Sequence, residues 1–158
     1  MADARFEDGG GVPLYLGAQD ADDLKVISAL VQDAVFPITE MTWTRGRREF
    51  VVLLNRFRWE DRDAADRAGR RYERVRSLLV FRDVLAVGSQ GIEQGERDAV
   101  LSLLSVAFEP GEDGMGRVVL TLAGDGVIAL KVEALDGMLR DVTRPYLAPS
   151  RHVPEHQD

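Results

Sequence analysis

Apolar residues first recur at helical spacing between residues 24 and 35. The apolar face consists of Leu24, Ile27, Leu30, Val31 and Val35. Asp20 precedes this run as a candidate N-cap, and Asp22 and Asp23 place carboxylates in the first turn, where they interact favourably with free N–H groups. Pro37 ends the helix at or before Phe36, because the residue before a proline disfavours helical geometry. The pattern therefore predicts one helix near the N-terminus.

From residue 38 to residue 132 the apolar spacing is typical of strands. In the segment 49–59 one face is predicted to hold Val51, Leu53, Phe57 and Trp59, and the other Phe50, Val52 and Leu54. Because both faces are apolar at the centre, this strand is expected in the middle of a sheet. The pattern predicts strands at residues 38–44, 49–59, 72–81, 84–90, 100–108, 118–122 and 127–132.

The links between these strands are mostly short. Arg82 and Asp83 tightly connect the third and fourth strands, and Gly124-Asp125-Gly126 contains the Asp-Gly pair typical of a hairpin. The segment 60–69 is predicted to be a loop or a frayed helical turn. Since parallel pairs need long crossovers, we expect consecutive strands to pair antiparallel.

The last element is predicted to be a second helix. Its apolar face consists of Leu135, Met138, Leu139 and Val142. Arg140 and Arg144 near its C-terminal end suit the helix dipole, and Pro145 prevents its continuation. Gly137 inside it costs about 1 kcal/mol relative to alanine.

The order of these elements predicts an α+β fold. We expect a meander of about seven antiparallel strands, in two packed sheets or a partly open barrel, with an N-terminal helix and a C-terminal capping helix. By element order alone this arrangement resembles the pleckstrin-homology-like (PH-like) fold. The alternative is a curled antiparallel sheet with both helices on one face. A single domain is expected over residues 14–148, with a flexible arm at 1–13 and a flexible tail at 149–158.

Three short segments carry a resemblance at the level of sequence. They are Asp22-Asp23-Leu24 through Ile27-Ser28-Ala29, Leu54-Asn55-Arg56-Phe57-Arg58-Trp59-Glu60, and Val84-Leu85-Ala86-Val87 through Gly91-Ile92. In these segments the chain resembles the bacterial domain-of-unknown-function family 2948, over about residues 14–145. The resemblance implies a soluble bacterial protein with no established activity, cofactor or catalytic residue, so it assigns no functional residue.

The composition excludes several kinds of chemistry. The 158 residues include no cysteine, and both histidines, His152 and His156, lie in the predicted tail. Cysteine nucleophiles and thiolate metal sites are therefore excluded, and a Ser-His-Asp arrangement lacks an imidazole in the expected core. Carboxylates at Asp61, Asp63 and Asp66 are explained by helix capping and solubility. We expect no metal and no cofactor, and the sequence favours a non-enzymatic protein while leaving an enzyme open.

The chain is also not expected to enter a membrane. No segment approaches the roughly 20 apolar residues of a membrane helix. The acidic N-terminus lacks the basic and apolar regions of a signal peptide. A soluble, cytoplasmic protein is the expectation.

Charge is distributed unevenly along the chain. The segment 45–82 holds 12 arginines and 6 acidic residues, a local net charge of +6, and since the whole chain carries −7, the remainder carries −13. If the central strands pair, several guanidinium groups line one strip of the sheet, which we call the arginine strip. The candidate residues for binding an anion or a partner are Arg45, Arg47, Arg48, Arg56, Arg58, Trp59, Arg74 and Arg76.

The arginine strip has a functional and a simpler explanation. Arginine binds carboxylates and phosphates in a bidentate manner, and an exposed Trp59 beside it would suit a protein interface. The simpler explanation carries more weight, since 18 of the 20 basic residues are arginine and charged sheet faces maintain solubility. Trp43, Phe57 and Trp59 are likewise expected to fill the core.

Three functions remain open on the sequence. The first is a non-enzymatic binding or protein-interaction module that uses the arginine strip, with a homodimer compatible. The second is a small-ligand binder or enzyme with a pocket of Arg56, Arg58, Asp61 and Asp63 at a barrel mouth. The third is nucleic-acid binding, which the net charge of the remainder opposes.

Overall fold

Eleven strands form a single bent sheet in the part of the chain that the structure describes. The computed structural model describes residues 12–92, 99–148 and 153–154. The strands are β1 (Tyr15–Ala18), β2 (Val35–Pro37), β3 (Met41–Thr44), β4 (Glu49–Phe57), β5 (Glu73–Phe81), β6 (Val84–Gln90), β7 (Val100–Pro110), β8 (Gly116–Leu122), β9 (Val127–Val132), β10 (Gly137–Asp141) and β11 (Tyr146–Leu147). The helices are α2 (Ala21–Leu30) and α3 (Arg62–Ala68), with short 3-10 turns η1 (Ile38–Glu40), η2 (Arg45–Arg47) and η3 (Trp59–Asp61).

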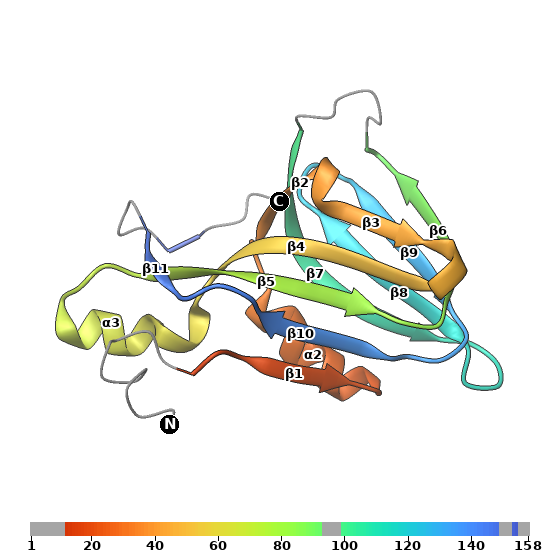
Figure 1. Ribbon diagram of the computed structural model, residues 1–158, viewed down its shortest axis with the longest axis horizontal. Helices are drawn as coiled ribbons and strands as arrows, with labels where there is room; N and C mark the ends of the chain where they lie inside the picture. The colour runs from red at the N-terminus through yellow and green to blue at the C-terminus, as the bar shows by residue number, and fades with distance from the viewer. Residues whose placement is uncertain (1–11, 93–98, 149–152, 155–158) are drawn as a thin grey trace.

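The sheet folds over itself into two layers. Its strand order is β1-β10-β5-β4-β2-β7-β8-β9-β6, with β3 paired to β4 and β11 paired to β5. We call β3, β4, β5, β10 and β1 the front layer, and β6, β7, β8 and β9 the back layer (Figure 1). The strand β7 joins the layers, because its start pairs with β2 and the rest pairs with β8. All these pairings are antiparallel, as the short links predict.

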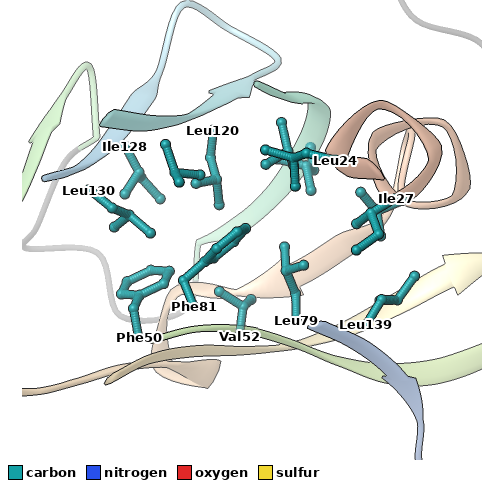
Figure 2. Packing of buried hydrophobic residues seen from close by; sticks show 14 of the residues in the cluster. Leu24, Ile27, Phe50, Val52, Leu79, Phe81, Leu120, Ile128, Leu130 and Leu139 are labelled. Carbon is teal, nitrogen blue, oxygen red and sulfur yellow. The ribbon is translucent and has the colours of Figure 1, made fainter. Parts of the chain in front are cut away.

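The hydrophobic core lies between the two layers. Alternate residues of each strand point inward, as Val52 and Leu79 do from the front layer and Leu120 does from the back layer (Figure 2). The helix α2 packs on β7 and β1 and adds Leu24 and Ile27, both almost completely buried. The N-terminal helix therefore closes the side of the sandwich between these two strands.

Two local predictions are confirmed, the start of the N-terminal helix and the β8–β9 hairpin. The helix α2 begins after Asp20, whose side-chain oxygen accepts a hydrogen bond of 2.8 Å from the backbone N–H of Asp23. It ends at Leu30, earlier than Phe36, because Val35–Pro37 forms strand β2 instead. The predicted β8–β9 hairpin is present. Its positive φ angles lie at Gly124 and Asp125, one residue before the Asp125-Gly126 pair that predicted the turn.

The predicted pairing of the third strand with the fourth is wrong. Both edges of β5 are already occupied, by β4 on one side and β10 on the other. The chain turns at Asp83, which has a φ of 57°. The strand β6 then joins the back layer and pairs with β9. The short link is therefore a corner between layers, and not a hairpin.

The predicted C-terminal capping helix is also wrong, since residues 137–141 form β10. The strand places Gly137, Leu139 and Asp141 inward and Met138 and Arg140 outward. A side chain at position 137 would bring its Cβ within 2.8 Å of a ring carbon of Phe81, so the close approach of that ring requires glycine. Over so short a segment the apolar residues fit both periods, and pairing with the edge of β5 that β4 does not occupy favours the strand.

The described residues form eleven strands instead of the predicted seven or so, and the resemblance to the PH-like fold is not supported. Three strands that the pattern did not predict, β2, β10 and β11, contain between two and five residues. Such short strands depend on distant pairing partners rather than on a local pattern. The described part of the chain has no C-terminal helix, on which the PH-like element order depended. The mostly antiparallel α+β fold is retained.

Several predictions lie outside the described residues. These are most of the arm 1–13, most of the tail 149–158 with His152 and His156, and residues 93–97 of the predicted loop. The segment 60–69, predicted as a loop or frayed turn, forms η3 and α3. No helix of the described residues is long and apolar enough to cross a membrane.

Candidate functional site

The predicted arginine strip does not form one surface. In the β4–β5 register Arg56 lies opposite Val75, so even-numbered residues of β4 share a face with odd-numbered residues of β5. Arg56 therefore points inward, whereas Arg74 and Arg76 point to the opposite face of the same sheet. The residue parity within each strand was visible in the sequence, but the register between the strands was not.

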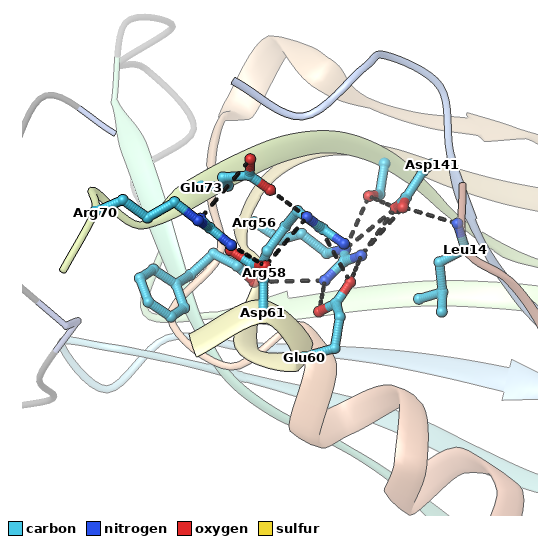
Figure 3. A network of polar contacts seen from close by, with 10 residues as sticks. Leu14, Arg56, Arg58, Glu60, Asp61, Arg70, Glu73 and Asp141 are labelled. Carbon is cyan, nitrogen blue, oxygen red and sulfur yellow. Dashed lines mark hydrogen bonds and ion pairs between the residues drawn. The ribbon is translucent and has the colours of Figure 1, made fainter. Parts of the chain in front are cut away.

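Arg56 is completely buried and belongs to an internal ion-pair network (Figure 3). Its Nη2 donates to Asp141 at 3.1 Å and to Glu60 at 2.7 Å, and its Nη1 donates to Glu60 at 2.9 Å. Its Nε donates to the hydroxyl of Ser77, which itself donates to Asp141 at 2.6 Å. Asp141 also accepts a hydrogen bond from the backbone N–H of Leu14. The network thus ties β4, β5, β10 and the start of β1 together.

Arg58 begins the second half of the same network. It contacts Glu73 through an ion pair and lies 3.6 Å from Glu60. Asp61 is 4.0 Å from Arg58 and accepts two hydrogen bonds, of 2.7 and 2.8 Å, from Arg70. Burying these groups is tolerated because each charge has an opposite partner.

The network does not have the charge of an anion site. Three guanidinium groups face four carboxylates. The guanidinium groups belong to Arg56, Arg58 and Arg70, and the carboxylates to Glu60, Asp61, Glu73 and Asp141. Each guanidinium group already contacts at least one carboxylate, and the buried Nε of Arg58, which has no hydrogen-bond partner among the described residues, lies 3.6 Å from Glu60. These residues therefore act as structural ties. Asp63, the remaining member of the predicted pocket, is exposed on α3.

The network predicts a specific response to acid. Burial raises the pKa of Glu60, but the hydrogen bonds and charge of Arg56 outweigh burial and hold that pKa below its ordinary value of 4.5. A carboxylate with a lowered pKa in the folded state stabilises the fold above its ordinary pKa, and the stabilisation is lost as the pH falls through the folded-state pKa. The difference in unfolding free energy between wild type and Glu60→Gln should therefore shrink as the pH falls from about 6 to about 3.

Urea unfolding followed by circular dichroism at several pH values measures this difference. Glu112→Gln is the control, because Glu112 is exposed in the turn between β7 and β8. The control should show little difference from wild type at any of these pH values. A gap between wild type and Glu60→Gln that is constant with pH would contradict the assignment.

The other predicted residues lie apart from this network. Arg45, Arg47 and Arg48 are exposed in and after η2, and Arg48 pairs with Glu133 at 3.1 Å. Trp59 is half-buried against Phe57, with ring centroids 4.6 Å apart, and its indole N–H donates to the backbone carbonyl of Gln32. Trp59 therefore supports the fold, as the simpler explanation expects.

The structure shows a surface that the sequence analysis did not single out, on the outer side of the front layer. One row across β4, β5 and β10 holds Val51, Val80 and Met138, and the next row holds Leu53, Leu78 and Arg140. We call the five apolar members, Val51, Leu53, Leu78, Val80 and Met138, the outer front face. The helix α2 packs on β7 and β1, and so does not cover these rows. In the sequence, a sign of this surface is the apolar character of both faces of the segment 49–59, which predicts a strand in the middle of a sheet.

Arginines border the outer front face. Arg76 lies beside Leu78 on β5, and Arg140 lies opposite Leu78 on β10. Both are exposed, and neither forms an ion pair with another described residue. Arg74 is half-buried and donates to Asn55 at 2.7 Å rather than to a carboxylate. Burial lowers the pKa of Arg74, and Tyr146 and Asp33 offset this only in part, but the group remains charged at neutral pH.

Comparison with known proteins places the chain in a family. A family model described as a protein of unknown function, DUF2948, matches residues 14–156, which is nearly the whole chain. The chain belongs to the DUF2948 family. The sequence resemblance noted in segments of α2, β4 and β6 is thereby confirmed. No curated protein and no solved structure matches this DUF2948 chain.

Proposed function

We propose that this DUF2948 protein is a non-enzymatic interaction module that binds another protein through the outer front face. The observation that carries the proposal is an apolar surface across β4, β5 and β10. Four of its five members are half-buried, and Val80 is buried. Arg76 and Arg140 border this surface, and neither forms an ion pair with another described residue. Apolar centres with a polar margin are typical of protein interfaces, and arginine is enriched in them.

The two outer faces of the sandwich differ in a way that supports this choice. The corresponding row of the back layer holds Ala107, Val119 and Ala129, and the next row holds Ser105, Thr121 and Val127. Small and hydroxyl side chains predominate there, whereas the front layer presents leucine, methionine and valine. The back layer buries leucine, isoleucine and valine in the core and still has small residues on its outer side, so the core does not require larger apolar residues on the outer side of a layer.

The charges at the margin indicate the chemistry of the partner. Arg74, Arg76 and Arg140 attract carboxylates at the rim of a complementary surface. Two copies of this chain meeting through the same face would bring these like charges together, which opposes a homodimer there. We therefore assign the face to a different protein that has an apolar patch with an acidic margin.

Site-specific photo-crosslinking in cells tests the proposal. A benzoylphenylalanine at Leu78, at the centre of the outer front face, is expected to form one discrete adduct with another protein. The matched position is Val119, at the centre of the outer face of the back layer, where no such adduct is expected. The double variant Arg76→Glu/Arg140→Glu should abolish the adduct, because it places carboxylates against the acidic margin.

A charge-matched variant controls for the change in net charge. Lys25→Glu/Lys131→Glu changes the charge equally, at two exposed residues on α2 and on the back layer, and should leave the adduct intact. The proposal fails if Leu78 and Val119 give the same adducts, or if both double variants behave alike. It also fails if the adduct joins two copies of this chain or two parts of one chain.

A further inference from the structure

The two layers leave a seam on the side opposite α2. The strand β3 pairs only with β4, and β6 pairs only with β9, so each has an edge free of strand partners among the described residues. At one end the seam is joined, where the backbone N–H of Val84 donates to the carbonyl of Arg48 at 2.9 Å. Farther along, the layers border a pocket of about 290 Å³.

Apolar side chains from both layers line this seam pocket. Its walls include Met41, Trp43 and Phe50 from the front layer and Val87, Ile92 and Ile128 from the back layer. None of the described lining residues carries a charge. A charged group would therefore lose its hydration in the pocket without gaining an opposite partner, which makes its binding costly.

Residues at the seam point inward and yet remain accessible. In the β6–β9 ladder Val87 lies opposite Leu130 and Ser89 opposite Ile128, so all four face the interior. Leu130 and Ile128 are buried, at 0% and 2% exposure, but Val87 is only half-buried and Ser89 is exposed. Protein interiors are normally close-packed, and a chain gains nothing for its own stability from leaving inward apolar residues uncovered.

Two of the lining residues have side chains that can donate a hydrogen bond. Trp43 and Ser89 carry the polar side-chain atoms of the lining. Neither side chain makes a hydrogen bond with another described residue. The indole N–H of Trp43 is only a donor, and the hydroxyl of Ser89 can donate, so the polar complement to this wall is an acceptor such as a carbonyl oxygen.

We propose that the seam pocket binds a small, uncharged and mostly apolar molecule that carries one carbonyl-type acceptor. Its volume of about 290 Å³ lies just below the roughly 300–1,000 Å³ typical of ligand pockets, so a short acyl chain or a single ring fits better than a long lipid. This site lies between the layers and is separate from the outer front face, so the two proposals stand independently.

Tryptophan fluorescence with defined probes tests the site. The chain has two tryptophans, and the Trp59→Phe variant leaves Trp43 as the reporter in the pocket wall. Titration with 2-octanone should change this fluorescence in a saturable way and raise the melting temperature. Octanoate, which has a similar chain but a charged head, should bind at least about tenfold more weakly, because its charge would be desolvated.

A pair of size-increasing variants locates the binding. Val87→Phe adds an inward side chain to the pocket and should weaken 2-octanone binding at least about tenfold, while circular dichroism still reports a folded protein. Ala86→Phe adds the same side chain on the neighbouring exposed residue and should leave binding unchanged. Absence of saturable binding, equal binding of octanoate, or equal affinity of both variants would overturn the proposal.

Discussion

Replacing Asp141 by asparagine should lower the free energy of unfolding by about 3 kcal/mol. The substitution keeps the size of the side chain and removes its charge. Arg56, which is completely buried, would then keep only Glu60 as an opposite charge, and Glu60 lies at the edge of the network. Burying a charge costs free energy because the charge loses its hydration, and an opposite charge nearby offsets that cost. Removing the partner leaves the cost in place, which explains the expected loss of stability.

Urea unfolding at neutral pH measures this loss. The control is Glu133→Gln, which removes the charge from the exposed Arg48–Glu133 pair and should cost less than about 1 kcal/mol. Equal effects of the two substitutions would show that the buried network carries no more stability than a surface pair.

Replacing Arg56, Ser77 and Asp141 together by apolar residues has a different expected outcome. In Arg56→Met/Ser77→Ala/Asp141→Leu the buried Arg56–Asp141 pair is removed as a whole, and Glu60 keeps Arg58 at 3.6 Å as an opposite charge. Apolar replacements of buried ion pairs are often neutral or stabilising. The network therefore matters less for stability than for alignment. It fixes β4, β5 and β10 in one register, and it holds Leu14 at the start of β1. The rows of the outer front face depend on that same register.

Replacing Leu139 by alanine should cost about 2–5 kcal/mol, whereas Met138→Ala should cost about 1 kcal/mol or less. Leu139 is completely buried between the layers, and Met138 is half-buried on the outer side of the front layer. In a strand, neighbouring residues point to opposite faces, so only Leu139 leaves a cavity in the core.

The comparison of these two variants separates the strand from the predicted helix. A helix would place Met138 and Leu139 on one apolar face, and both substitutions would then be costly. Thermal and urea unfolding of the two single variants measure the difference. Similar large losses for both would contradict the position of β10 in the sheet.

The confirmed predictions depend on residues that are close in the chain, whereas the wrong ones depend on contacts between distant residues. The N-cap at Asp20, the turn at Gly124 and Asp125, and the alternation along β4 all depend on residues that are close in the chain. These features are confirmed because their physical causes, a cap hydrogen bond, a positive φ angle and the two-residue period of a strand, are local.

The arginines show the opposite case. The sequence predicted which residues alternate on each strand, but the register of β4 against β5 decides which of them share a face. That register buried Arg56 with Asp141, which lies 85 positions away. No local pattern in the sequence indicates that contact. Arg56 was therefore predicted on a surface but lies in a buried ion-pair network.

By itself the sequence determined an antiparallel α+β domain, its N-terminal helix, its last hairpin and its family. Tertiary structure alone decided that residues 137–141 form a strand and that β6 joins the back layer. It also decided that an apolar surface and a seam remain accessible. The physical reason is that edges, registers and uncovered faces arise only when distant segments meet, because each strand completes its hydrogen bonds with partners far along the chain.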